Sequence, residues 1–311
     1  RCPCGPPLRP PRQRPPVPAD YDYSVTTCVA HRHAAYAGTS EEGLEIVKAY
    51  DPERHGELCG EFADIRRRLD YSWHVNYTPQ RQAWQDGVVQ RTLGRCALAP
   101  PEREPWAVFT CGAMGAGKGH VMGWLSHHSA FPLKDVVRID PDRFKYAMPE
   151  WDGYRRHDAA AAGAMCHRES GLLQELALEA ALRFGHHVWV DGSLGDSDWY
   201  ASVFDDVRAR FPRYRIAIVY VYCSPAKVYE RAEHRGRRSG RLVPRSALRE
   251  SIEATRRSIQ ALGPLADFVA QVDNELDGPA AREAASPQGA PALTGFRGDP
   301  GPFAELVAQL D

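Results

Sequence analysis

Short apolar runs alternate with amphipathic segments along most of the second half of the chain. Five runs have the length of buried strands: WAVFTC (106–111), DVVRID (135–140), HVWVD (187–191), YRIAIVYVYC (214–223) and DFVAQVD (267–273). Between them, apolar residues at helical spacing predict helices near 118–129, 158–184, 198–210, 225–236 and 245–262. This alternation predicts an α/β fold with a three-layer core, in which helices cover both faces of a parallel sheet.

The segment before this core has a helical pattern instead. Three stretches predict helices: SEEGLEIVKAY (40–50), GELCGEFADIRRRLDYSW (56–73) and TPQRQAWQDGVVQRTL (78–93). The last has Thr78 as its cap and Pro79 at the first helical position. We therefore expect a Pro-rich disordered segment at 1–20, a helical region at 21–100, the α/β core at 101–275, and a linker with a short C-terminal helix at 276–311.

Composition restricts the partners and the compartment. The formal net charge is -1, so no overall field favours nucleic acid or an anionic membrane surface. No apolar run approaches the roughly 20 residues of a membrane span. The eight cysteines include no CxxC pair, which is typical of reduced cysteines in a cytoplasmic protein. The first residue is Arg1 rather than Met, so the sequence leaves open an upstream targeting segment.

A glycine-rich loop follows the first predicted strand and precedes a predicted helix. Gly112, four residues, Gly117 and Lys118 fit the G-x-x-x-x-G-K motif, whose backbone N–H groups surround a phosphate while the lysine reaches the outer phosphates. The expected nucleotide contacts are Gly112, Ala113, Met114, Gly115, Ala116, Gly117, Lys118, Gly119 and His120. Gly119 stands where Ser or Thr normally offers a hydroxyl to Mg²⁺, and His120 offers no hard oxygen ligand.

Carboxylates follow two further strands, at the edge of the sheet where α/β proteins bind ligands. Asp140 and Asp142 lie just after the second strand, and Asp191 lies after the third. Asp142 is the candidate that accepts a proton from a substrate hydroxyl, although it could instead cap a helix beginning at Arg143. Asp191 is the candidate for holding a Mg²⁺-bound water or a substrate hydroxyl, although an Asp before Gly192 could simply form a turn.

The segment RAEHRGRRSGRLVPRSALR (231–249) holds seven arginines and one glutamate, and glycines interrupt it. A glycine-hinged arginine loop is suited to closing over phosphates, because a guanidinium binds phosphate through paired hydrogen bonds. A solvated basic helix end or a nucleic-acid patch would have the same composition.

These motifs, in this order and spacing, resemble the zeta toxin family of P-loop kinases over about residues 105–275. The resemblance is carried by GAMGAGKG, IDPDRFK, MPEW, VWVDGS, YERAEHR and SGRLVP, and HRESG (167–171) and DSDWY (196–200) make the chain most similar to eukaryotic-type members. The resemblance implies a kinase that uses ATP or GTP with Mg²⁺. In bacterial members the acceptor is the sugar 3′-hydroxyl of UDP-N-acetylglucosamine.

The resemblance also implies roles for particular residues. Lys118 matches the P-loop lysine, Asp142 the general base, and Arg231 and Arg241 the two phosphate-contacting arginines. Asp191 falls where bacterial members carry a substrate-contacting glutamate. With Asp142 and Asp191, we expect Lys145 and Glu169 to contact the acceptor. The helical region before residue 100 has no counterpart in the bacterial toxin domain.

Two other functions remain open on the sequence. Gly119 and the extra helical region fit a nucleotide-binding regulatory protein with weak or no catalysis, and the arginine cluster fits a polynucleotide or RNA-end kinase. We expect a nucleoside triphosphate and a small-molecule acceptor as ligands and do not expect nucleic acid. The sequence gives no protein partner.

Overall fold

The structure of the chain is a computed structural model. It describes residues 15–36, 47–94, 99, 104–127, 131, 135–239, 243–275 and the backbone of 292–297. These residues belong to two compact units, each considered by itself below. Among the described residues, the sheet unit comprises those from 99 to 138 and those from 185 onward, and the helical unit comprises those from 15 to 94 and from 139 to 184.

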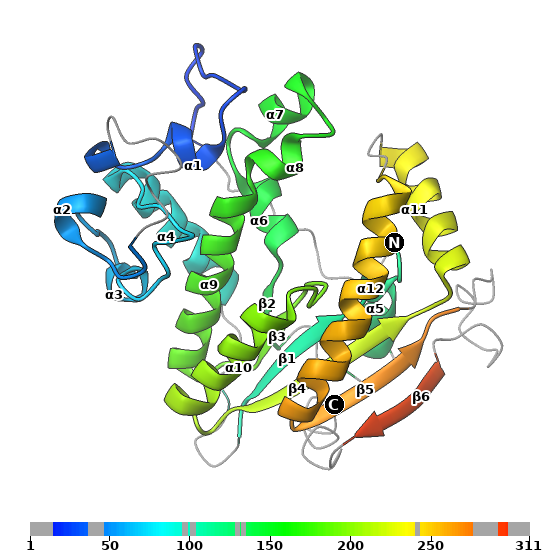
Figure 1. Cartoon of the computed structure of the whole chain (residues 1–311). Coiled ribbons are helices and arrows are strands. Elements are labelled where there is room, and N and C mark those ends of the chain that lie inside the picture. The colour runs from blue at the N-terminus through cyan, green and yellow to red at the C-terminus, as the bar shows by residue number, and fades with distance from the viewer. Residues whose placement is uncertain are drawn as a thin grey trace. The chain divides into compact units, whose positions relative to one another are not determined.

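A six-stranded sheet is the centre of the sheet unit (Figure 1). Its strands are β1 (Trp106–Cys111), β2 (Val137–Ile139), β3 (Val188–Val190), β4 (Arg215–Tyr222), β5 (Phe268–Asp273) and β6 (Ala292–Arg297). Their order is β2-β3-β1-β4-β5-β6. Strand β1 pairs in parallel with β3 and β4, β4 pairs in parallel with β5, and β6 runs antiparallel to β5. The first five strands are those predicted from the apolar runs.

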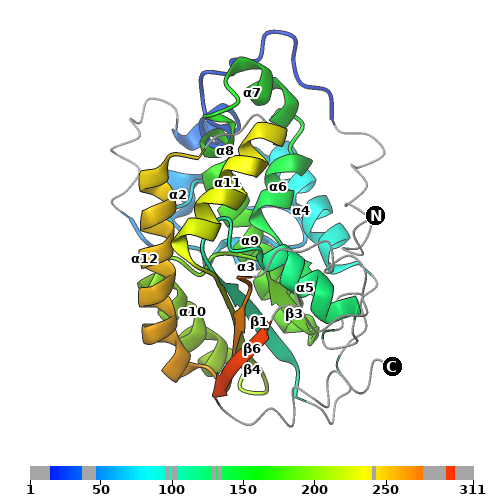
Figure 2. The ribbon, with the colours of Figure 1, turned by 90° about the vertical axis from the view of Figure 1, so that its right-hand side faces the viewer.

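Helices cover both faces of this sheet, as the alternating pattern predicts. They are α5 (Lys118–His127), α10 (Ser197–Arg210), α11 (Pro225–Ser239) and α12 (Arg245–Leu262), followed by the 3-10 turn η3 (Gly263–Leu265). Figure 2 shows α10 and α12 on one side of the strands and α5 on the other. All six residues of β1 are buried, because this strand lies between two neighbours and two helical layers.

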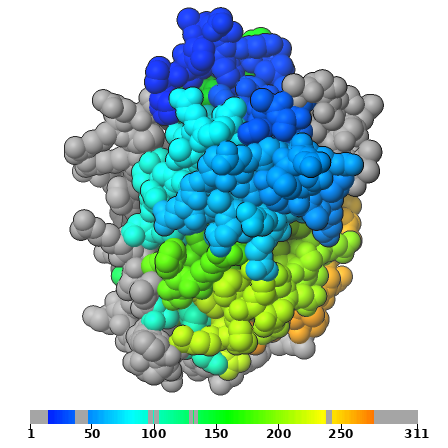
Figure 3. Space-filling model, turned by 90° about the vertical axis from the view of Figure 1, so that its left-hand side faces the viewer, coloured from blue at the N-terminus to red at the C-terminus, as the bar shows by residue number. Residues whose placement is uncertain are grey.

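The helical unit joins the N-terminal segment to the stretch that follows β2. Its elements are α1 (Thr27–Ala30), η1 (Ala34–Tyr36), α2 (Pro52–His55), α3 (Ala63–Arg66), α4 (Pro79–Leu93), α6 (Pro141–Ala147), α7 (Trp151–His157), α8 (Ala162–Met165) and α9 (His167–Phe184). Helix α9 packs against α4 and α6. The described N-terminal residues, blue to cyan in Figure 3, form a continuous surface.

A buried network of charged groups connects three segments of the helical unit. Arg81 of α4 is 5% exposed and bonds to two carboxylates: Nη1 and Nη2 to Glu150 (2.9 and 3.1 Å), and Nε and Nη2 to Glu169 (2.7 and 3.0 Å). His31 Nε2 lies 2.8 Å from Glu150. Gln85 donates to Glu169 at 2.8 Å. Charges taken out of water need such complete pairing, so the network joins α4 to α7 and α9.

The structure corrects several expectations. Only α3 is helical within 56–73, and the helix expected over 158–184 divides at Cys166 into α8 and α9. The linker expected within 276–311 contains β6, and no local sequence pattern predicts the pairing of β6 with β5. Helix α4 begins at Pro79 with Thr78 as its cap, as predicted. The helix expected from 40 lies mainly outside the described residues, as do most of the Pro-rich segment and the C-terminal helix.

None of the described helices combines the length and apolar character needed to cross a membrane.

Candidate functional site

The glycine-rich loop joins the end of β1 to the start of α5. Gly112, at φ +154°, and Gly117, at φ +87°, hold its turns. A Cβ atom at Gly112 would lie 2.4 Å from the Val221 carbonyl oxygen, and one at Gly117 would lie 2.3 Å from Asn274 Nδ2. Both positions therefore require glycine for conformation and for space. The loop leads directly into the N-terminal end of α5, where backbone N–H groups and the helix dipole attract anions.

Lys118 lies against the carbonyl groups at the beginning of the same loop. Its Nζ donates to Gly112 O at 2.7 Å and to Ala113 O at 3.2 Å. The ammonium is therefore at the loop itself, where it can neutralise phosphate charge. The buried Cys111 before the loop is a core residue rather than a reactive thiol, because desolvation raises its pKa to about 12.

Two polar side chains hold the far end of the loop. The carbonyl oxygen of Ala116 accepts from Asn274 Nδ2 (2.8 Å) and from Arg231 Nη1 (3.3 Å). Arg231 Nη2 also donates to Asn274 O at 2.7 Å. Arg231 comes from α11, and Asn274 follows β5, so three separate elements meet at this carbonyl. The guanidinium is thus placed next to the loop, as a phosphate-contacting arginine must be.

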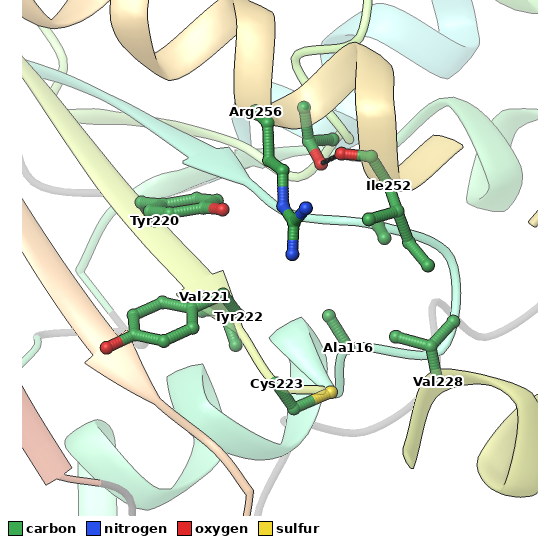
Figure 4. A pocket seen from close by; sticks show the side chains of 10 residues that line it. Ala116, Tyr220, Val221, Tyr222, Cys223, Val228, Ile252 and Arg256 are labelled. Carbon is green, nitrogen blue, oxygen red and sulfur yellow. Dashed lines mark hydrogen bonds between the residues drawn. The ribbon is translucent and has the colours of Figure 1, made fainter. Parts of the chain in front are cut away.

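A pocket adjoins the loop between the end of β4 and helices α11 and α12 (Figure 4). Its lining is formed by Ala113, Ala116, Tyr220, Val221, Tyr222, Cys223, Val228, Ile252, Thr255 and Arg256. Tyr220 and Tyr222 are stacked, with ring centroids 5.4 Å apart. The Arg256 guanidinium extends into this space in Figure 4. On the α12 side, Ser251 Oγ accepts from the backbone N–H of Met114 at 3.1 Å.

The two aspartates after β2 have different structural roles. Asp140 caps α6, and its carboxylate accepts from the backbone N–H groups of Asp142 (3.1 Å) and Arg143 (3.3 Å). Asp142 is therefore not the cap; it lies in the first turn of α6, and its side chain is 49% exposed. Lys145 lies one turn later and donates to Asp142 Oδ1 at 3.2 Å. This leaves Asp142 as an accessible carboxylate with a neighbouring cation.

Asp191 is ion-paired within the sheet unit. Arg138 of β2 bonds to its carboxylate, and the same guanidinium lies 4.5 Å from the ring centroid of Trp189 on β3. Only 13% of the Asp191 side chain is exposed. This carboxylate is the one that the sequence predicts to hold a metal-bound water. In the structure, the ion pair with Arg138 compensates much of its negative charge.

The residues present do not fit a protein-held Mg²⁺. Gly119 has no oxygen-bearing side chain, and Asp191 is occupied by Arg138. Among the residues that the structure describes, no three His, Cys, Asp or Glu side chains come together as a metal cluster requires. Oxygen ligands are what Mg²⁺ prefers, so we derive no step through a metal held by this chain.

Glu169 does not fit the role of an acceptor contact. It is fully buried, and Arg81 and Gln85 bind its two oxygens. Arg241 lies outside the described residues. The arginine segment is also less loop-like than expected, because α11 continues through the buried Gly236 to Ser239. Of its described arginines, four lie in α11 and two at the start of α12: Arg231, Arg235, Arg237 and Arg238, and then Arg245 and Arg249.

Sequence reasoning missed Asn274 and Arg138. Asn274 follows a predicted strand, so the strand-end argument applied to the aspartates would have found it. Arg138 lies within an apolar run, and its polarity there was the only signal. Arg81 lies in a segment whose sequence allowed it to pack inward, and it is buried, but no local signal indicated its partners Glu150 and Glu169.

The strand, glycine loop and helix, with a lysine at the loop and parallel neighbours on both sides, define a P-loop NTPase core of the kinase type. Residues 62–275 match the profile of the family described as Zeta toxin. The chain therefore belongs to the zeta toxin family. The match begins at residue 62, so it includes α3 and α4.

One solved structure with a similar chain supports this fold. A chain of the PezAT chromosomal toxin–antitoxin system of Streptococcus pneumoniae is 14% identical, with a TM-score of 0.51 over 64% of this chain and 78% of that chain. A chain of the AvrRxo1-ORF1:-ORF2 complex with ATP is also 14% identical, with a TM-score of 0.47 over 76% and 73% of the two chains. No curated protein matches the chain.

Proposed function

We propose that this protein is an ATP- or GTP-dependent phosphotransferase that phosphorylates a hydroxyl group of a small molecule. The observation that carries the proposal is the loop at 112–118, whose lysine lies at the loop carbonyls and whose far end is held by Arg231 and Asn274. Transfer of a γ-phosphate needs little covalent chemistry from the protein; it needs positioning and charge neutralisation. The loop supplies both.

In this proposal the nucleotide phosphates bind the backbone N–H groups of residues 112–119 and the start of α5. Lys118 neutralises the β- and γ-phosphates, and Arg231 stabilises the charge that develops during transfer. Asp142 accepts the proton of the acceptor hydroxyl and orients it, and Lys145 contacts the acceptor beside it. The family resemblance suggests a UDP-N-acetyl sugar as one acceptor. The buried Glu169 takes no part in this version of the site.

The test uses two variants of the whole chain with labelled ATP and a panel of sugar nucleotides, nucleosides and sugars. We expect Lys118→Ala and Asp142→Asn each to lower turnover at least about a hundredfold. Lys227→Ala is a matched control: Lys227 is on α11 and pairs with Glu230, so its loss should leave turnover unchanged. Full activity in both test variants would contradict the mechanism.

A nucleotide-binding regulatory protein is the second candidate function. The observations that favour it are Gly119, which lacks a hydroxyl, and the Asp191–Arg138 ion pair, which occupies the carboxylate expected from the sequence to hold a metal-bound water. This candidate predicts that ATP or GTP binds to the wild-type chain and that Lys118→Ala abolishes binding, while no acceptor in the panel becomes phosphorylated.

A further inference from the structure

The pocket between β4 and α12 lies directly beside the phosphate loop, and all of its lining residues belong to the sheet unit (Figure 4). Two residues of the loop, Ala113 and Ala116, form one wall. Strand β4 is paired with β1 as far as Cys111, which is opposite Tyr220, and then continues to Tyr222. Tyr222 is therefore level with the beginning of the loop, so a ligand in this pocket would also contact the loop.

Helix α12 forms another wall, and two contacts hold it against the loop and the end of β1. Ser251 Oγ accepts a hydrogen bond from the backbone N–H of Met114 at 3.1 Å. The thiol of the buried Cys111 donates to the carbonyl oxygen of Thr255 at 3.7 Å. Arg256 is the next residue of the helix, so these contacts fix the position of its backbone relative to the loop.

The pocket combines apolar side chains with two tyrosines and one arginine, and none of its lining residues is Asp or Glu. Tyr220 and Tyr222 are half-buried, and their stacked rings have centroids 5.4 Å apart. The exposed Arg256 extends into the space beside them in Figure 4, and in the described part of the chain no group accepts a hydrogen bond from its guanidinium. Aromatic rings and a guanidinium both stack on flat rings. The lining therefore suits a flat heterocycle that accepts hydrogen bonds.

We propose that this pocket holds the base of the donor nucleotide and that Arg256 selects guanine over adenine. The inference rests on the proposed function, because the nucleotide phosphates are taken to bind at the loop. A guanidinium donates parallel N–H groups to two neighbouring acceptors, which guanine offers as O6 and N7. Adenine has N7 but carries an amino donor in place of O6, so it can accept only one of the two hydrogen bonds. The tyrosine rings stack on either purine and add affinity without selecting between them.

Nucleoside diphosphates test the inference without turnover, because they have no γ-phosphate to transfer. The affinities of GDP, ADP, IDP and 7-deaza-GDP are measured by calorimetry on the wild-type chain. We expect GDP to bind about tenfold more tightly than ADP, as one paired arginine–guanine contact would give. IDP keeps O6 and N7 and should bind like GDP. The compound 7-deaza-GDP has a C–H group in place of N7, so its affinity should approach that of ADP.

Variants of α12 and β4 separate selection from stacking. Arg256→Met should lower the affinity for GDP about tenfold and leave that for ADP little changed, because only guanine loses a paired contact. Arg257→Met is the matched control, since Arg257 is the adjacent exposed arginine of the same helix and does not line the pocket. Tyr222→Leu removes a ring and should weaken GDP and ADP by a similar factor. Thermal unfolding of each variant verifies that the fold is intact.

The inference is overturned if wild type binds GDP and ADP equally, if 7-deaza-GDP binds as tightly as GDP, or if Arg256→Met keeps the preference for GDP. In each of these cases, phosphate transfer from ATP or GTP to an acceptor would still support the proposed phosphotransferase. Conversely, Arg256-dependent selection of GDP without phosphorylation of any acceptor supports the inference and contradicts the phosphotransferase. If no nucleotide binds, both are wrong.

Discussion

At the scale of single residues, two glycines of the phosphate loop have opposite tolerances. A Cβ atom at Gly119 would meet no heavy atom within 4 Å, and this residue belongs to the regular first turn of α5. At Gly117 a Cβ atom would collide with Asn274, and the backbone has positive φ. The fold therefore does not require glycine at position 119. A larger side chain would fit there, so steric hindrance does not explain why this position has no hydroxyl.

The variant Gly119→Ser adds the side-chain hydroxyl that P-loops commonly offer to Mg²⁺. We expect the protein to fold as wild type. Its turnover at limiting Mg²⁺ should rise several-fold, which corresponds to about 1 kcal/mol, the typical net contribution of one hydrogen bond. The measurement is kcat as a function of Mg²⁺ concentration. Gly117→Ser is the contrasting variant and should weaken ATP binding. An unchanged Mg²⁺ dependence in Gly119→Ser would show that the metal does not approach this position.

At the scale of elements, buried charges rather than a simple apolar stripe join α4 to α7 and α9. Burial acts to raise the pKa of Glu150, but hydrogen bonds and charge from His31 and Arg81 outweigh it and lower the pKa to about 2. The folded state therefore holds this carboxylate ionised. The stability it contributes is present above the ordinary pKa of about 4.5 and is lost as the pH falls toward about 2.

Arg81→Met tests the network. It leaves the carboxylates of Glu150 and Glu169 buried without their shared cation, and removal of one partner from such a network costs about 3–5 kcal/mol. We expect the free energy of unfolding of the helical unit to fall by about that amount in urea denaturation followed by circular dichroism. Arg183→Gln is the control, because its pairs with Asp64 and Glu179 are at the surface and should contribute less than about 1 kcal/mol. Equal losses in the two variants would refute the role of burial.

At the scale of the whole molecule, an ionisable group in the sheet unit makes stability depend on pH. Burial lowers the pKa of His187 from 6.5 to about 4, and His186 contributes in the same direction. The neutral ring accepts a hydrogen bond from the backbone N–H of Trp106 at 3.1 Å. His187 binds a proton below about pH 6.5 in the unfolded chain, but only below about pH 4 in the folded chain. Stability therefore decreases as the pH falls through this window.

His187→Asn replaces the imidazole with an amide that keeps an acceptor oxygen but does not titrate. Wild type should lose on the order of 1–3 kcal/mol of stability between pH 7 and pH 4.5, and the variant should lose clearly less. Thermal unfolding across this pH range measures the difference. If the stability of the two proteins falls in parallel as the pH is lowered, groups other than His187 cause the acid sensitivity. Glu150 contributes to such a loss only below about pH 4.5.

The sequence by itself determined the elements whose signals are local. Apolar runs of strand length located β1 to β5, and the G-x-x-x-x-G-K spacing located the phosphate loop, because backbone conformation and burial periodicity are encoded by neighbouring residues. The Thr78 cap of α4 was predictable for the same reason. The position of the aspartates after the second predicted strand likewise located Asp140 and Asp142, although the sequence offered Asp142 as the possible cap and the structure has Asp140.

Only the tertiary structure decided how distant residues are paired. Glu169 resembled an acceptor contact until Arg81, 88 residues earlier, was found to hold it in the interior. Asn274 reaches Ala116 across 158 residues, and Arg138 reaches Asp191 across 53. The division of 139–184 from the sheet unit, and the strand β6, were equally hidden. Long-range packing determines which residue pairs with a buried charge and which strand pairs with an edge strand. The local periodicity of the sequence carries no information about either partner.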